Sequence, residues 1–184
     1  MAATVRAGAC AAILLTLTLP SSAQTRDGLM GDLIKDVTDV EKKVVSLARA
    51  MPAEAHAWRP GKGVRSTGEV LAHIAADNYF MPAAMSIAAP AETGITKEYK
   101  TAAAFEKRTM TRDQVIAEVE KSFAFLKKSM EGVADAQLNA PLEIFGQKTT
   151  SRSMWISTAT HLHEHLGQLI AYARSNNVTP PWSK

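Results

Sequence analysis

The feature that most constrains the fold is a regular spacing of apolar residues over residues 26–51. These residues recur at alternating intervals of three and four, which is the period of an α-helix with one face buried against other helices. Charged side chains occupy many of the positions between them, as expected for the face that meets water. The stripe predicts one helix of a bundle and consists of Met30, Leu33, Val37, Val40, Val44, Leu47 and Met51.

The rest of the chain repeats this helical pattern, and no segment shows the strict alternation of a half-buried strand. Two helix starts are marked by capping boxes, Ser66 with Glu69 and Thr111 with Gln114. Pro82 removes a backbone hydrogen bond and should kink its helix or end it early. Three further helices are therefore predicted, over residues 66–87, 111–131 and 153–176.

The predicted helices are separated by long connectors rather than tight turns. Residues 52–65 are rich in proline and glycine and hold His56, which we expect to face solvent. Residues 89–104 look irregular, with one or two helical turns over 102–108, and residues 133–150 contain another short turn. The sequence thus predicts an all-α protein, a four-helix bundle with long connectors between its helices.

The first 23 residues have the layout of a secretory signal peptide. Arg6 precedes the apolar run 11–19, and Pro20 is followed by the small residues 21–23. The run is shorter than the ~20 residues that span a bilayer, so we expect cleavage after Ala23 and no stable membrane insertion. Residues 24–184 would then form the bundle domain of a periplasmic or secreted protein.

Composition limits the chemistry of this domain. The only cysteine of the chain, Cys10, lies in the predicted signal peptide, so the domain has no disulfide or thiolate ligand, and a metal site must use His, Asp, Glu or water. Without Arg6 the domain has 20 basic and 18 acidic residues. This balance, and the lack of a basic patch interleaved with aromatic residues, argues against a nucleic-acid partner.

Three of the five histidines lie within five residues in the last predicted helix. His161 and His165 are one turn apart and share a face, whereas His163 lies about 200° away. His73 lies on the apolar stripe of the second predicted helix, with Asp77 one turn further. A bundle can bring His73, His161 and His165 together as a metal site with open positions. The alternative is that these histidines are core residues bonded to hydroxyls or carbonyls.

Other metal motifs fit less well. The chain lacks the His-Glu-x-x-His sequence of zincins and the paired Glu-x-x-His sequences of di-iron bundles. An iron site with two histidines and Asp77 stays open, although its sequence signature is missing.

Short motifs on the second and last predicted helices can be compared with known families. They are Arg59-Pro60, Gly63-Val64-Arg65-Ser66, Gly68-Glu69-Val70-Leu71-Ala72-His73-Ile74-Ala75 and His161-x-x-x-His165-x-Gly167-Gln168. Over roughly residues 28–175 the chain resembles the DinB/YfiT-like superfamily of metal-binding four-helix bundles.

This resemblance implies that His73, His161 and His165 bind a divalent metal, most often zinc or nickel, with iron or manganese as further options. It also implies a homodimer and an unknown small-molecule partner. Some members of the superfamily are transferases or isomerases that use low-molecular-weight thiols. Export would place this chain in an oxidising compartment, which does not suit a reduced thiol cosubstrate.

We therefore expect an exported, DinB-like, metal-dependent enzyme of the hydrolase or transferase type. Asp77 is the predicted catalytic residue, as a base or as a support for the ligands, because it shares a face with His73. Glu164 is the weaker choice, because it lies one residue off the ligand face. The alternatives are a non-catalytic module that binds a metal or a small ligand, and a purely structural bundle.

Overall fold

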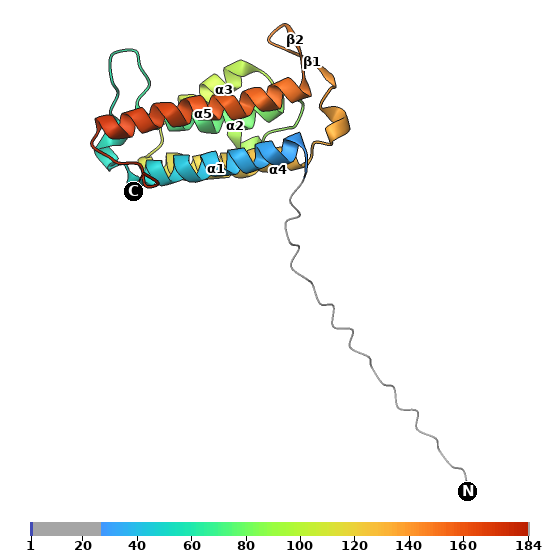
Figure 1. Cartoon of the computed structure of the whole chain (residues 1–184), viewed down its shortest axis with the longest axis horizontal. Coiled ribbons are helices and arrows are strands. Elements are labelled where there is room, and N and C mark those ends of the chain that lie inside the picture. Colours follow the sequence, from blue (N-terminus) through green and yellow to red (C-terminus); the bar gives the residue numbers. More distant parts are fainter. Residues whose placement is uncertain (2–26, 184) are drawn as a thin grey trace.

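The computed structural model describes Met1 and residues 27–183, and four long helices dominate it (Figure 1). Helices α1 and α2 each pack against both α4 and α5, which closes a four-helix bundle. The prediction of an all-α four-helix bundle is confirmed. Within residues 27–183, no helix is long and apolar enough to cross a bilayer. The long helices are α1 (Leu29–Ala50), α2 (Thr67–Ala84), α4 (Arg112–Glu131) and α5 (Ser151–Ser175).

The predicted signal peptide over residues 1–23 lies, apart from Met1, outside the described residues. Export of the protein, which depends on that segment, therefore stays a prediction.

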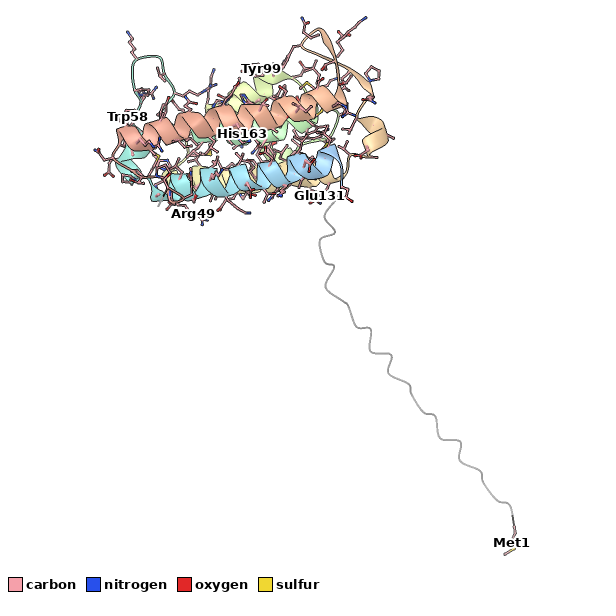
Figure 2. The ribbon with its side chains drawn as sticks, viewed as in Figure 1. Met1, Arg49, Trp58, Tyr99, Glu131 and His163 are labelled. Carbon is pink, nitrogen blue, oxygen red and sulfur yellow. The ribbon has the colours of Figure 1, made fainter. Side chains whose placement is uncertain are left out.

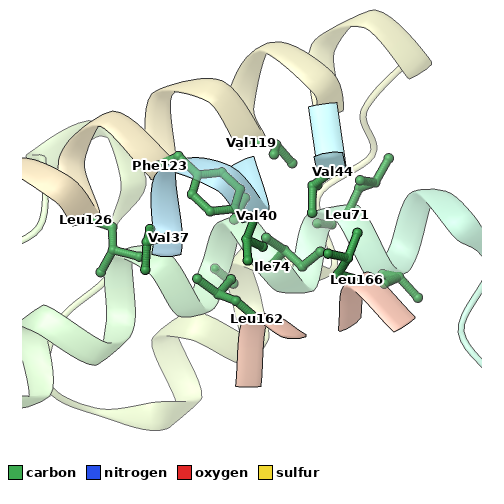
Figure 3. Packing of buried hydrophobic residues seen from close by; sticks show 14 of the residues in the cluster. Val37, Val40, Val44, Leu71, Ile74, Val119, Phe123, Leu126, Leu162 and Leu166 are labelled. Carbon is green, nitrogen blue, oxygen red and sulfur yellow. The ribbon is translucent and has the colours of Figure 1, made fainter. Parts of the chain in front are cut away.

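The core lies along the axis of the bundle, where apolar side chains of all four long helices meet (Figure 3). Leu162 and Leu166 of α5 are buried in this core. His161 and His165 each precede one of these leucines, so they lie about 100° round the helix, at the edge of the core. The apolar packing thus fixes the direction of the two histidines. Figure 3 labels Val37, Val40, Val44, Leu71, Ile74, Val119, Phe123, Leu126, Leu162 and Leu166.

Both predicted capping boxes are present. Ser66 Oγ accepts a hydrogen bond from Glu69 N at 3.2 Å, and Glu69 Oε2 accepts one from Ser66 N at 2.7 Å. Thr111 and Gln114 make the same pair of bonds at the start of α4. Helix α2 ends at Ala84, two residues after Pro82, which is the early end that was one of the two predicted effects of this proline.

A small β-hairpin before α5 was not predicted. Strands β1 (Pro141–Ile144) and β2 (Gln147–Thr150) pair antiparallel, and Phe145 and Gly146 form the turn with left-handed φ values of 54° and 72°. The strands are short, β2 is polar, and the turn lacks the usual Asn-Gly sequence, so no pattern marked them. The connector between α2 and α4 forms a short helix, α3 (Tyr99–Glu106), which begins earlier than the turns predicted over 102–108.

The prediction that His56 faces solvent is wrong. Residues 53–56 form a short 3-10 helix that folds back against α1, and His56 is only 8% exposed. Its Nε2 lies 3.3 Å from the carbonyl oxygen of Ala48, and burial lowers the pKa of the imidazole. His56 is therefore a packed histidine at one end of the bundle.

Candidate metal centre

The structure brings the three predicted ligand histidines together between α2 and α5. The ring centroid of His73 lies 4.6 Å from that of His165 and 5.3 Å from that of His161. One ligand nitrogen from each ring can be chosen so that all three lie within 4.8 Å of one another. His163 points away, toward α1, where its Nε2 lies 2.9 Å from a carboxylate oxygen of Asp36. Figure 2 labels His163 on the side of α5 that faces α1.

The Nε2 atoms of the three rings face the inside of the cluster. His161 Nε2 lies 3.2 Å from His165 Nε2 and 2.7 Å from Asp77 Oδ2. His73 Nε2 lies 3.2 Å from the same carboxylate oxygen. Three imidazole nitrogens and one carboxylate oxygen thus crowd around one point.

Two of the Nδ1 atoms face hydrogen-bond acceptors on the outside. His73 Nδ1 lies 2.8 Å from Glu106 Oε1, and His165 Nδ1 lies 2.9 Å from Gln168 Oε1. Both partners are acceptors, so the Nδ1 atoms donate and the inner Nε2 atoms keep their lone pairs. This is how metal-binding histidines are held, with one nitrogen bonded to the protein and the other free for the ion.

The charges and hydrogen bonds of His161 and His165 show how a proton and a cation would differ at the centre of the cluster. The hydrogen bond to Asp77 raises the pKa of His161, against the opposing effect of burial. Burial lowers the pKa of His165, which the hydrogen bond to Gln168 offsets only in part. A proton on His161 Nε2 can satisfy one of its two close neighbours. A cation at the same point can satisfy all of the inward-facing atoms, so the cluster could hold a metal ion.

The structure places the two predicted acidic residues differently. Asp77 is 7% exposed and its Oδ2 lies on the inner, Nε2 side of the cluster. Glu164 has a side chain that is 77% exposed, and its Oε2 lies 3.6 Å from His161 Nδ1, too far for a good hydrogen bond. Asp77 is therefore the acidic residue that can act at this centre.

Sequence reasoning missed Glu106. This residue ends α3 and has a side chain that is 16% exposed, between His73 and Arg65. Burial raises the pKa of Glu106, but the hydrogen bond and charge of His73, together with Arg65, outweigh burial and lower it overall. The only available signal was an acidic residue within the predicted turns over 102–108. Nothing in the sequence indicated that α3 would pack against His73.

The fold and the cluster define the class of this protein, a four-helix bundle with a candidate metal centre between two of its helices. The family model of the DinB superfamily matches residues 37–169. The chain therefore belongs to the DinB superfamily.

Solved structures share this fold at low sequence identity. A DinB-like protein from Bacillus subtilis has a TM-score of 0.62 and 16% identity, covering 80% of this chain and 93% of that one. A DinB-like protein from Bacillus cereus has a TM-score of 0.65 and 16% identity, with 85% and 97% covered. A mutant of the mycothiol-dependent maleylpyruvate isomerase has a TM-score of 0.61 and 11% identity, with 77% and 61% covered. No curated protein matches the chain.

Proposed function

We propose that this protein binds a divalent metal through His73, His161 and His165 and acts as a metal-dependent enzyme on a small molecule. The observation that carries the proposal is the orientation of the rings. Their Nε2 atoms converge, while Glu106 and Gln168 hold the Nδ1 atoms of two of them from outside. Zinc and nickel suit three imidazoles best, and iron or manganese would be favoured by an added carboxylate.

The reaction we propose is hydrolysis or group transfer. A metal ion of this type would act as a Lewis acid that activates a bound water or another nucleophile. Asp77 would accept the proton of that nucleophile, because its carboxylate lies on the inner side of the cluster beside His73 and His161. Leu162 and Leu166, buried beneath the histidines, would keep water from reaching the centre through the core.

The proposed export of the protein bears on which type of reaction it catalyses. The maleylpyruvate isomerase with a similar fold depends on mycothiol, as its name says. We propose that the present protein is exported, to the periplasm or outside the cell, where oxidising conditions disfavour a free thiol cosubstrate. A hydrolase, or a transferase without a thiol, fits that location better. The homodimer implied by family resemblance is also a proposal.

The metal site is tested by metal content. We expect the purified wild-type protein, loaded with zinc or nickel and dialysed, to hold about one ion per chain. His161→Ala should hold roughly a tenth of that or less, because losing one ligand weakens binding on the order of a hundredfold. His163→Ala is the matched control, since His163 lies on the same helix but faces Asp36. Equal metal in wild type and His161→Ala would refute the site.

A non-catalytic binding module is the second candidate, and one contact favours it. Asp77 Oδ2 lies close to two of the Nε2 atoms, so the carboxylate could serve as a fourth ligand and close the coordination sphere. Closed sets of four ligands are typical of structural metal sites.

Asp77→Asn separates the two candidates. If Asp77 is a base, we expect the variant to keep its metal but lose at least about a hundredfold in any hydrolase or transferase activity found by screening the loaded protein. If Asp77 is a ligand, metal affinity should fall instead. Activity that survives chelation of the metal would contradict metal-dependent catalysis.

A further inference from the structure

A chain of hydrogen bonds begins on the outer side of His73 and leads to the connector before α2. His73 Nδ1 donates to Glu106 Oε1 at 2.8 Å. The other oxygen of the same carboxylate, Oε2, accepts from an Nη atom of Arg65 at 3.1 Å. Arg65 therefore holds the acceptor that fixes the tautomer and orientation of His73.

A second chain starts on the outer side of His165 and ends on the same connector residue. His165 Nδ1 donates to Gln168 Oε1 at 2.9 Å, and Gln168 Nε2 donates to Tyr172 Oη at 2.9 Å. The Tyr172 hydroxyl then donates to the backbone carbonyl oxygen of Arg65 at 3.1 Å. The two outer chains of the histidine cluster thus meet at Arg65, one through its side chain and one through its backbone.

The connector is fixed against α5 by a further contact. The rings of Trp58 and Tyr172 meet edge to face, with centroids 5.3 Å apart. Thr67 N donates to the Trp58 carbonyl at 3.1 Å, which ties the connector to the start of α2. Movement of this segment would therefore disturb the acceptors of His73 and His165 together.

We propose that Arg65 is a positioning residue, which couples the orientation of His73 to that of His165 and so sets the metal affinity of the centre. This inference rests on the proposed metal site. The Arg65 side chain is 41% exposed, so its ion pair with Glu106 adds little to the stability of the fold. Its effect lies instead in holding Glu106 against His73. Loss of an acceptor that contacts a ligand weakens metal binding about 10- to 100-fold, so displacing this acceptor should reach the lower end of that range.

The test measures zinc affinity by competition with a chromogenic chelator. Arg65→Ala should bind zinc about tenfold more weakly than wild type, and Arg65→Lys should recover part of that loss. Arg59→Ala is the matched control, because Arg59 lies in the same connector and bonds to Glu69 and to the Val64 carbonyl, neither of which belongs to the two hydrogen-bond chains. It should stay within about twofold of wild type. The metal-free proteins should melt within about 3 °C of one another, which separates positioning from unfolding.

A double-mutant cycle tests the coupling itself. Tyr172→Phe removes the hydroxyl that joins Gln168 to Arg65. Arg65→Ala and Tyr172→Phe each break one of the two hydrogen-bond chains that meet at Arg65. The fold-loss of zinc affinity in the double variant should therefore be smaller than the product of the fold-losses in the two single variants. The cobalt-loaded variants should also show an altered visible absorption band, since ligand orientation changes.

The possible failures are distinct. A wild-type protein that binds no metal would overturn the proposed function. A wild-type protein that binds zinc, with Arg65→Ala equal to Arg59→Ala, would overturn the positioning role alone. Independent effects of Arg65→Ala and Tyr172→Phe would overturn the coupling.

Discussion

Zinc is expected to raise the melting temperature of the wild-type protein by about 10 °C and that of His73→Ala by only about a third as much. An ion that binds only the folded state stabilises it by about 4 kcal/mol at a thousandfold excess over its Kd. For a domain of this size each kcal/mol shifts the melting temperature by roughly 2–4 °C. His73 supplies one of the three imidazoles of the cluster, so its loss should weaken zinc binding on the order of a hundredfold. At the same zinc concentration, about a tenfold excess over the Kd then stabilises the variant by roughly 1.4 kcal/mol.

This prediction is checked by thermal unfolding of each variant with and without zinc, so that any effect of the substitution on the metal-free fold cancels. His163→Ala should respond to zinc as the wild type does, because its ring contacts Asp36 on α1. A zinc shift of full size in His73→Ala would mean that the ion binds without His73, through the other residues of the cluster. EDTA should reverse the shift in the wild type.

Local patterns in the sequence were enough to predict the bundle. The apolar stripe over 26–51 became α1, and the two capping boxes start α2 and α4 where they were expected. These signals work because helix periodicity and capping involve residues only three or four apart. The hairpin before α5 has no such signal, because its four-residue strands depend on pairing with each other and on the bundle beneath.

The candidate centre was predictable only in part, because only some of its contacts follow from local patterns in the sequence. His161 and His165 mark a face by their spacing, and His73 lies on an apolar stripe, so the bundle itself implied that they meet. Their outer contacts come from distant segments, since Glu106 lies 33 residues from His73. Tyr172 lies 107 residues from the Arg65 carbonyl that it contacts. Contacts of this kind depend on how connectors pack, and helix periodicity carries no information about them.

The second large effect is expected in the core, from Phe123→Ala. Phe123 lies on α4, is 0% exposed, and packs in the centre of the bundle (Figure 3). Replacing a buried phenylalanine with alanine removes its apolar contacts and leaves a cavity, which costs about 3–5 kcal/mol of unfolding free energy. Urea unfolding of the metal-free protein measures this loss. Ile156→Ala is the control, because Ile156 is 40% exposed and its loss should cost about 1 kcal/mol or less.

Phe123→Ala also tests whether the site depends on the core as a whole or on α2, α3 and α5. Helix α4 contributes no residue to the cluster of His73, His161 and His165. The variant should therefore bind zinc with the wild-type Kd wherever it is folded, and zinc should raise its melting temperature by a similar increment. A Kd that weakens in proportion to the lost stability would show instead that packing across the whole bundle holds the histidines in place. The direct contacts and outer hydrogen bonds of the cluster would then be insufficient to orient them.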